Sequence, residues 1–279
     1  MDPLIKRGRH ISDATNEALD QDLYRVIRGR VNGLKKAPDA RLVPYLEQAS
    51  FGTATKIRVS DLFYDLLSAL VERWRPETHT FHFPCGECTV TLEDIAMQLG
   101  LQIDGRPVTG ISSFTDPAAL CYQLLGDSSG DDESNFTSLK FTWLKAKFGQ
   151  LSATATEGEL MCTTRAYIMH IIGGVLMPDA NNNKVHLMYL PLLVDLSSVG
   201  SYSWGSAVLA VLYRELCRTT NPDVVDMADA SHCCSPGRCI GCHFWHRLVT
   251  NRGVFVRVSG GRTLSRYTDS CWNSMPEKG

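Results

Sequence analysis

The sequence predicts a mainly α-helical protein, a single helical domain that carries one small β-hairpin. Apolar residues recur at helical spacing in several long segments, and one short segment alternates between apolar and polar residues. No alternation of strand and helix segments is visible, so a parallel sheet is not expected. The 279 residues suffice for one large domain or two small ones, and they can bury a core without disulfides or a structural metal.

The first strongly periodic segment covers residues 61–74. Leu62, Leu66 and Leu70 recur at i, i+4 and i+8, and further apolar residues lie beside them, which makes one wide apolar face. We therefore predict an amphipathic helix over the whole of this segment. Pro76 follows two residues later and ends the helix.

The predicted hairpin comes next. Phe81 and Phe83 alternate with polar residues, and an interruption at 84–87 that contains glycine precedes a second short strand. Thr91 is then positioned to cap a helix over 92–99. The residues that we expect this helix to bury are Leu92, Ile95, Ala96 and Leu99.

Further helices are expected after residue 110. An Asp-Pro pair opens a short helix at 117–125, and another follows at 139–148. The segment 157–177 is apolar on nearly all sides, so we expect it to be central. Ser203 is predicted to cap a last helix over 204–217. On that helix the residues expected to lie together, away from the apolar side, are Arg214, Glu215 and Arg218.

Isolated histidine and tryptophan residues in these segments are interpreted as core residues. His170 lies within the most apolar predicted helix, where a histidine is more often a hydrogen-bonded core residue than a ligand or a base. Trp74, Trp143 and Trp204 are large apolar residues of predicted helices. We therefore assign none of the four to a functional site.

Charge and hydropathy exclude several protein classes. The formal net charge is −2, so general attraction to nucleic acid is not expected. The N-terminus lacks the apolar stretch of a secretory signal. The most apolar segment, 166–177, is shorter than the roughly 20 residues that cross a bilayer. We therefore expect no membrane association, a nuclear or cytosolic location, and ten cysteines that are reduced thiols.

Two long motifs resemble a known family. One covers residues 74–110 and begins Trp74-Arg-Pro-Glu-Thr-His79, and the other covers residues 189–217 and begins Tyr189-Leu-Pro-Leu-Leu-Val194. Both are similar to the plant mobile domain, also named aminotransferase-like, of MAIN-like proteins and their transposon-encoded relatives. With the helices between the motifs, the resemblance covers about residues 42–220.

The resemblance implies a non-enzymatic nuclear module that acts through protein partners. It implies roles in meristem maintenance, genome stability and the silencing of transposons and genes. The implied partners are a phosphoprotein phosphatase-like protein and chromatin or silencing factors. The motifs supply turns, caps and buried helices, and no nucleophile, base and oxyanion site comes together in them. We accordingly assign no catalytic, cofactor-binding or metal-binding residue.

The resemblance also divides the chain. Residues 1–41 form a polar, partly basic N-terminal segment, and residues 42–220 form the plant mobile domain, which we expect to be incomplete at its C-terminal side. Residues 221–279 form a divergent tail rich in cysteine and arginine. Our hypothesis is that the tail does not fold with the domain and reflects a truncated or alternatively spliced gene model, or a shifted reading frame.

Two alternative functions use other residues. A transposon-derived nucleic-acid-binding module would use the basic N-terminal arm or a zinc-held tail, but the arm lacks interleaved aromatic residues, so we interpret it as solvated surface. A pyridoxal phosphate enzyme would need a Schiff-base lysine. The lysines between Arg75 and Arg218 lie on a predicted solvent face or in an Asn-rich loop, which opposes that role. They are Lys140, Lys145, Lys147 and Lys184.

A Cys-x-x-Cys pair lies in the predicted hairpin. Cys85 and Cys88 have the spacing of half a tetrahedral zinc site or of a redox pair. His79 and His82 are near in sequence, but strand alternation should put His82 on the face opposite Phe81. We therefore interpret the pair as structural.

A second cysteine cluster lies in the tail. Cys239-x2-Cys242-x3-His246, with Cys233 or Cys234 upstream, has the ligand types and spacing of one tetrahedral zinc site. The competing interpretation is that this segment does not fold as part of the domain. We favour the second interpretation and assign no cofactor to the chain.

Overall fold

The computed structural model describes nine stretches of the chain. Residue ranges, element bounds and burial below refer to these stretches. They are residues 37–56, 70–83, 86–110, 114–128, 136–149, 151–177 and 183–220, together with two short strands at 256–258 and 262–264.

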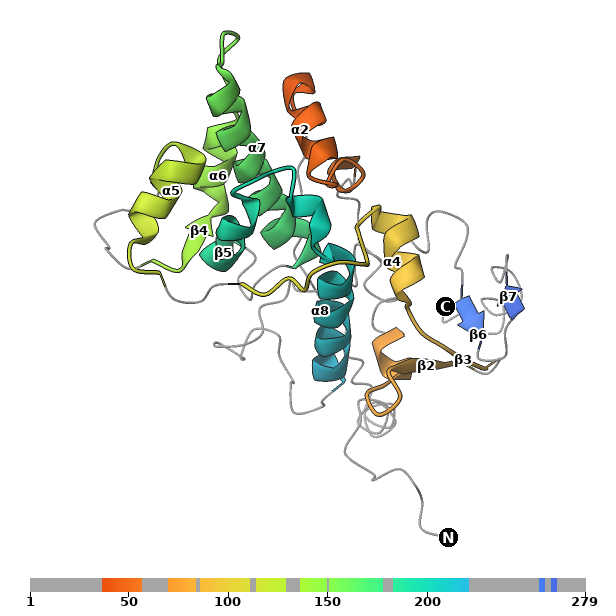
Figure 1. Ribbon diagram of the computed structural model, residues 1–279. Helices are drawn as coiled ribbons and strands as arrows, with labels where there is room; N and C mark the ends of the chain where they lie inside the picture. Colours follow the sequence, from red (N-terminus) through yellow and green to blue (C-terminus); the bar gives the residue numbers. More distant parts are fainter. Residues whose placement is uncertain are drawn as a thin grey trace, which may run out of the picture.

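A body of helices forms one side of the molecule (Figure 1). It contains α5 (Pro117–Leu125), α6 (Phe141–Gly149) and α7 (Glu157–Ile171), and α7 continues as a π-helical turn, η3 (Ile172–Leu176). Every residue in the range 163–177 is buried. The segment 157–177 is therefore the central helix that the sequence predicted.

A small sheet closes the body below α6 and α7. Strand β4 (Ser138–Lys140) pairs antiparallel with β5 (Lys184–His186). Val185 of β5 lies so near Gly173 that a Cβ atom there would come within 2.5 Å of the valine Cβ. The glycine therefore allows the π-helical turn to pack directly against β5. A 3-10 helix follows, η4 (Leu187–Leu193).

The N-terminal part of the described chain packs on the other side of α7. It contains η1 (Ala40–Leu42), α2 (Val43–Gln48) and η2 (Ala54–Lys56). Arg41 donates to the carbonyl oxygen of Ser152 at 2.7 Å. That hydrogen bond joins this segment to the residues just before α7.

The hairpin forms part of a three-stranded antiparallel sheet with the order β1-β2-β3. The strands are β1 (Trp74–Arg75), β2 (Thr80–Phe83) and β3 (Gly86–Cys88). Helix α4 (Leu92–Leu99) follows directly. Together they form the side of the molecule opposite the helical body (Figure 1).

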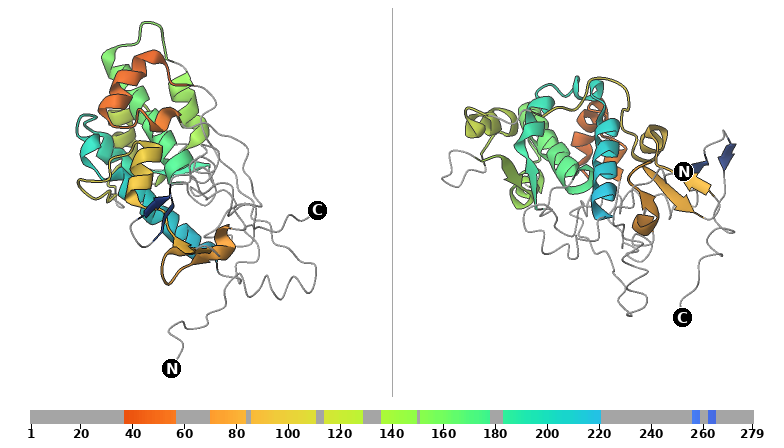
Figure 2. Two further views of the ribbon diagram at one scale, coloured as in Figure 1. Left: turned by 90° about the vertical axis from the view of Figure 1, so that its right-hand side faces the viewer. Right: turned by 90° about the horizontal axis from the view of Figure 1, so that it is seen from below.

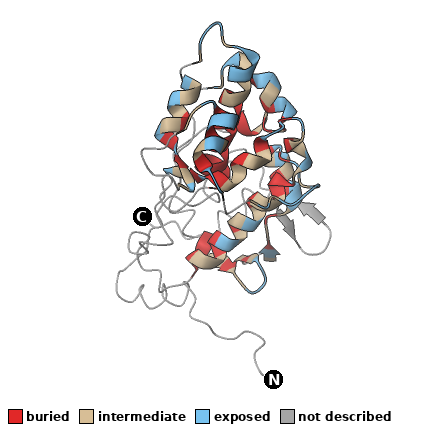
Figure 3. Ribbon diagram, turned by 60° about the vertical axis from the view of Figure 1, so that its left-hand side comes forward, coloured by how far each residue is buried: buried red, intermediate tan, exposed pale blue. Residues whose placement is uncertain are grey.

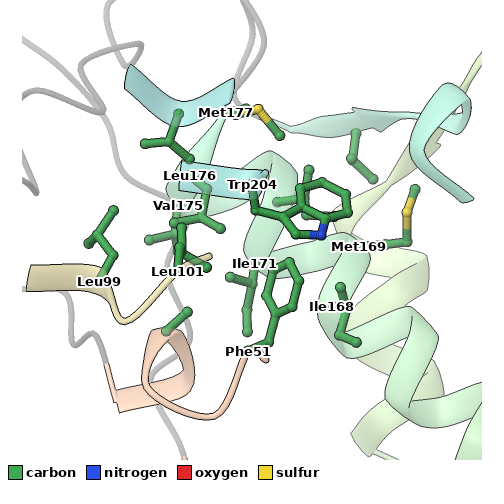
Figure 4. Close-up of a cluster of buried hydrophobic side chains, with 14 of the residues drawn as sticks. Phe51, Leu99, Leu101, Ile168, Met169, Ile171, Val175, Leu176, Met177 and Trp204 are labelled. Carbon is green, nitrogen blue, oxygen red and sulfur yellow. The ribbon is translucent and has the colours of Figure 1, made fainter. Parts of the chain in front are cut away.

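Helix α8 (Trp204–Thr219) lies between the helical body and the hairpin side (Figures 1 and 2). A short 3-10 helix, η5 (Val199–Ser201), precedes it. Buried residues run through the centre of the molecule in Figure 3. Figure 4 shows how Phe51 and Trp204 meet the side chains of α7, with their ring centroids 5.3 Å apart in an edge-to-face arrangement.

A second hairpin lies in the C-terminal part of the chain. Strand β6 (Val256–Val258) pairs antiparallel with β7 (Arg262–Leu264) in a sheet of their own. Figure 1 shows β6 next to β3, and the two strands are in contact. The sequence did not predict this hairpin.

The predicted fold class is confirmed: the described part of the chain is mainly α-helical, and its named sheets are small and antiparallel. The hairpin is confirmed, but its second strand, Gly86–Cys88, begins inside the predicted interruption at 84–87. The helices at 92–99 and 117–125 are confirmed with their bounds. Of the predicted helix at 61–74, residues 70–73 are helical and residues 61–69 lie outside the described stretches. In the described stretches no helix has the length and apolarity needed to cross a membrane.

Two predicted helix boundaries were wrong for the same reason. Trp74 is not the end of a helix but the start of β1, because its backbone pairs with that of Phe81. Leu139 belongs to β4 and pairs with Val185, so helix α6 begins two residues later than predicted. In both places pairing with a distant segment overrides the local helical pattern.

Three predicted side-chain environments were also wrong. Leu92 is exposed, because it is the first residue of α4 and lies at the very end of the apolar face. Glu215 is buried, although it does pair with Arg218 at 2.6 Å as expected. Lys184 lies in β5 and not in a loop, because its backbone pairs with that of Lys140.

Candidate functional site at the junction of two motifs

The two sequence motifs meet in space. The first, residues 74–110, contains the three-stranded sheet and α4, and the second, residues 189–217, contains η5 and most of α8. Helix α4 packs against α8, and β1 also touches α8. We call the contact between these two stretches the motif junction. It brings together segments that are about a hundred residues apart in the chain.

Backbone hydrogen bonds hold the middle of the motif junction. Gly205 N–H donates to the carbonyl of Gln102 at 2.8 Å, and Ser203 N–H donates to the carbonyl of Arg106 at 2.8 Å. In return, Arg106 N–H donates to the carbonyl of Ser201 at 2.9 Å. Gly105 has φ +113°, and a Cβ there would collide with the Ser201 carbonyl oxygen. The close approach of the two chain segments therefore requires glycine at this position.

Ser203 occupies the N-cap position of α8, as predicted, but its side chain does not cap the helix. Its hydroxyl donates to the carbonyl oxygen of Ile103, and Ser206 donates to the same oxygen at 3.0 Å. The two hydroxyls thus bind the first motif to the start of α8. The predicted role was wrong because a carbonyl from a distant segment competes successfully for the serine hydroxyl.

The buried side chain of Trp204 also holds the start of α8 in the motif junction. Its side chain is buried, and its indole N–H donates to the carbonyl of Val199 at 3.0 Å. The indole therefore combines apolar packing against Phe51 with a satisfied polar atom. The prediction that Trp204 is a core residue is confirmed.

Aromatic residues and hydroxyls join the far end of α8 to the hairpin. Tyr213 donates to the carbonyl of Val90 at 2.6 Å, and its phenol oxygen lies 2.8 Å from the Thr89 hydroxyl oxygen. Thr89 donates to the carbonyl of His79 at 2.6 Å. Burial raises the pKa of Tyr213, which keeps the phenol protonated and able to donate. The Trp74 ring packs against the Tyr213 ring, with the two ring centroids 5.4 Å apart.

The outer surface of the motif junction carries an exposed arginine. The guanidinium of Arg106 lies 4.3 Å from the centre of the Tyr202 ring and donates to the Ser201 hydroxyl at 2.8 Å. A stacked arginine keeps its remaining donors available to a partner, so this surface can bind a carboxylate or a carbonyl oxygen.

A groove of about 440 Å³ lies beside the motif junction, between residues 47–56 and the end of α4. Gly100, one of its lining residues, adopts φ +64°, and a Cβ there would collide with Thr53. The groove is mainly polar, and its size fits a small polar ligand or a peptide side chain. It is lined by Glu47, Ser50, Gly52, Thr53, Lys56, Ala96, Gly100, Leu101 and Gln102.

Comparison with protein families decides the identity of the domain. The sequence profile of the plant mobile domain matches residues 50–271. The chain belongs to this family. The resemblance seen in the two motifs is therefore confirmed, and the match continues past residue 220 into the segment that the sequence analysis assigned to a divergent tail. The division of the chain at residues 41 and 220 stays a prediction.

Curated relatives from Arabidopsis thaliana are similar over most of the chain. The chain is 43% identical to "Serine/threonine-protein phosphatase 7 long form homolog" over 80% of its own length and 16% of that protein. It is 39% identical to "Protein MAIN-LIKE 2" over 76% of its length and 32% of that protein. It is 41% identical to "Protein MAINTENANCE OF MERISTEMS" over 62% and 36%, respectively.

The names of these relatives describe much longer proteins. The chain spans less than half the length of each of the three. What the whole relatives do can therefore lie outside the shared region. No solved structure matches the chain significantly.

The plant mobile domain also contains a buried arginine that the sequence analysis missed. Arg165 of α7 donates to the carbonyl oxygens of Leu193 at 2.8 Å, Val194 at 2.9 Å and Leu124 at 3.2 Å. It thereby joins the ends of α5 and η4 to α7. The signal in the sequence was a lone arginine inside an apolar helix, which burial makes costly unless its donors are satisfied.

Of the Cys-x-x-Cys pair the structure describes Cys88 alone, so the structural role of the pair stays a prediction. Cys88 is buried, and Cys85 lies outside the described stretches. His82 pairs across the hairpin with Glu87 at 3.3 Å, while Phe81 is buried, so the predicted alternation is confirmed. No cluster of three metal-ligating side chains occurs among the residues that the structure places.

The other singled-out residues have structural positions. His170 is fully buried, and its ring meets that of Phe141 edge-to-face at 4.7 Å, which confirms it as a core residue. Trp143 is only partly buried against the core. Lys147 forms an ion pair with Asp127 at 2.8 Å.

The remaining candidates belong to the two ends of the chain. The tail cluster from Cys233 to His246 and the basic N-terminal arm both lie outside the described stretches.

Proposed function

We propose that this plant mobile domain is a non-enzymatic protein-interaction module that acts in the nucleus. In this proposal it contributes to meristem maintenance, genome stability and the silencing of transposons and genes. Its partners are a phosphoprotein phosphatase-like protein and chromatin or silencing factors. Similarity to MAIN-LIKE 2 and MAINTENANCE OF MERISTEMS supports the meristem role.

The observation that carries the interaction role is how the motifs use their polar groups. Hydroxyls of Ser203, Ser206 and Tyr213 donate to main-chain carbonyls, and so does the indole of Trp204. These side chains of the second motif thus hold the two segments together and position the surface around Arg106. A rigid surface of this kind favours binding, because little freedom is lost when a partner docks.

The proposed phosphatase-like partner has one further support. A similar region occurs within a much longer relative whose name is that of a phosphatase homolog. Two modules that occur in one chain in some proteins can bind one another as separate chains in others. We therefore place the phosphatase-like protein first among the partners to be tested.

The test is affinity purification of the tagged chain from plant nuclei, with two variants that differ from it by one methyl group each. Gly105→Ala disturbs the motif junction, whereas Gly158→Ala adds a methyl group where no atom of another segment lies within 4 Å. We expect the native chain and Gly158→Ala to recover a phosphatase-like protein, and Gly105→Ala to lose at least about nine tenths of it. Equal recovery by all three would place the binding surface elsewhere.

Two further measurements separate this proposal from its alternatives. A fluorescent fusion that stays outside nuclei would contradict the nuclear role. DNA binding that falls steeply with salt, and that disappears when Lys6, Arg7, Arg9, Lys35 and Lys36 are replaced, would favour the nucleic-acid-binding module instead.

A further inference from the structure

The three-stranded sheet has two edges that differ in their neighbours. Strand β1 is two residues long and lies against α8. Strand β3 forms the other edge and is in contact with β6, which among the described strands is paired with β7 in a separate sheet. An edge strand presents unpaired N–H and C=O groups that readily accept another strand, so proteins usually cover such an edge.

The C-terminal hairpin has its own reasons to form. Val256 pairs with Leu264 and Val258 with Arg262. Three residues, Ser259-Gly-Gly261, separate the two strands, and a short connection containing glycine is typical of a β-hairpin. The valines of β6 are β-branched, which favours a strand.

The hairpin also falls inside the family region. The plant mobile domain profile extends to residue 271, and β6 and β7 end at residues 258 and 264. A tail translated in a shifted frame would have no reason to continue this match. Sequence similarity and spatial position therefore both attach the hairpin to the domain.

We propose that the outer edge of β3 is a strand-docking site and that its occupant is β6 of the same chain. Backbone hydrogen bonds between Gly86–Cys88 and Val256–Val258 join the β6–β7 hairpin to the three-stranded sheet. The C-terminal hairpin is then an integral part of the domain. Its loss exposes the β3 edge to an extended segment of a second copy, by the same strand addition.

This proposal does not depend on the function proposed above. It concerns which segment completes the sheet, and it holds for an interaction module and for a nucleic-acid-binding module alike. Each of the two can fail while the other stands.

The first experiment removes the pairing capacity of β6 in the full chain. Proline lacks the N–H group and disrupts a paired strand, so Arg257→Pro should release β6 from β3. Ser274→Pro is the matched control, because it lies beyond the family match. Hydrogen exchange at Gly86, Glu87 and Cys88 is measured residue by residue by NMR.

Within β3, the amides that bond to β2 serve as a reference for those that face away from it. Amides of an antiparallel strand point alternately to its two neighbours. Those facing away from β2 should exchange at least about tenfold faster in Arg257→Pro, while those bonded to β2 and the whole of the control stay unchanged. The proposal is overturned if outward amides exchange equally fast in the native chain and in Arg257→Pro.

The second experiment identifies the occupant directly. A photoreactive residue replaces Glu87, which is exposed on β3, and the cross-linked peptides are identified by mass spectrometry. We expect cross-links to the segment around β6 within one chain, at a yield independent of protein concentration. Cross-links only between chains, or to other segments only, would overturn the assignment of β6 as the occupant.

Discussion

The helical body and the motif junction are held together by different means. In the body, all residues from 163 to 177 are buried, and apolar packing predominates. In the junction, main-chain groups of 102–106 and 201–205 bond to each other directly, and Gly105 fits where no Cβ could. One region depends on the volume of its side chains, and the other depends on backbone geometry.

The difference determines which substitutions each region tolerates. Packing requires apolar residues of suitable volume, and many combinations satisfy it. A backbone junction requires glycine or serine at fixed positions, so the residue types themselves are determined. The stretches 74–110 and 189–217, which carried the resemblance, are the two sides of that junction.

The largest effect should come from the buried arginine that connects the helical body. Arg165→Ala leaves the buried carbonyls of Leu193 and Leu124, and the part-buried carbonyl of Val194, without their donor. Because charged hydrogen bonds and buried unsatisfied carbonyls each contribute, we expect a loss of about 3–5 kcal/mol of unfolding free energy. Urea denaturation followed by circular dichroism measures it.

The control for this prediction is Arg214→Ala, whose side chain is 69% exposed. It should change the free energy of unfolding by no more than about 0.5 kcal/mol. A loss below about 1 kcal/mol for Arg165→Ala would mean that apolar packing alone holds the body together.

The next largest effect is the different cost in stability of adding one methyl group to each region. Gly105→Ala introduces a Cβ at φ +113° against the Ser201 carbonyl, and we expect it to cost about 2–4 kcal/mol. Gly158→Ala lies in the first turn of α7 in open space and should be neutral or stabilising by up to about 1 kcal/mol. Thermal unfolding of the two variants side by side is the measurement, and destabilisation of equal size would remove the distinction.

The sequence was sufficient for features that depend on neighbouring residues. The Thr91 cap and the Asp116-Pro117 start were predictable, because their hydrogen bonds lie within three residues. Strand β4 and the carbonyl contacts of Arg165 were not, because their partners are long-range. The role of Ser203 was missed for the same reason, since Ile103 lies a hundred residues away.

The sequence analysis also failed to predict the C-terminal hairpin, for a different reason. Its strands are three residues long and lie in a segment rich in arginine, serine and glycine, which suggested a tail outside the domain. The Gly260-Gly261 pair between two β-prone segments was the available signal. Among the site features, the motif residues were found from sequence, but their mutual contact required the structure.

A smaller effect is expected from the capping boxes, of which each region contains one. Thr91 and Thr156 each form a capping box, with Asp94 and Glu159 respectively. Asp94 is buried, whereas Glu159 is exposed. Thr91→Ala should therefore cost about 1–2 kcal/mol and Thr156→Ala about 0.5–1 kcal/mol. The order of the two, measured by urea denaturation, is the decisive outcome, and the reverse order would show that burial of the acid does not matter.

The smallest expected effect is a difference in reactivity between two thiols, Cys121 and Cys217. Burial in α5 raises the pKa of Cys121 to about 12, and its thiol is fully enclosed. Cys217 of the motif junction is only partly buried and accepts a hydrogen bond from the Trp74 indole at 3.4 Å. Alkylation at about pH 8, followed by mass spectrometry, should label Cys217 in the folded chain and Cys121 only as the whole domain unfolds.

The raised pKa of Cys121 also gives this comparison a pH dependence of known sign. In the unfolded chain the thiol ionises near pH 8.5, roughly, whereas in the folded chain it stays protonated to about 12. Its contribution to stability is therefore complete below the unfolded pKa and declines as the pH rises above it. Cys121→Ala should flatten the loss of stability between pH 9 and 11, roughly, relative to the native chain. An unchanged slope would show that the Cys121 thiol ionises alike in the folded and the unfolded chain. Labelling of Cys121 before Cys217 would show that the helical body opens more readily than the motif junction.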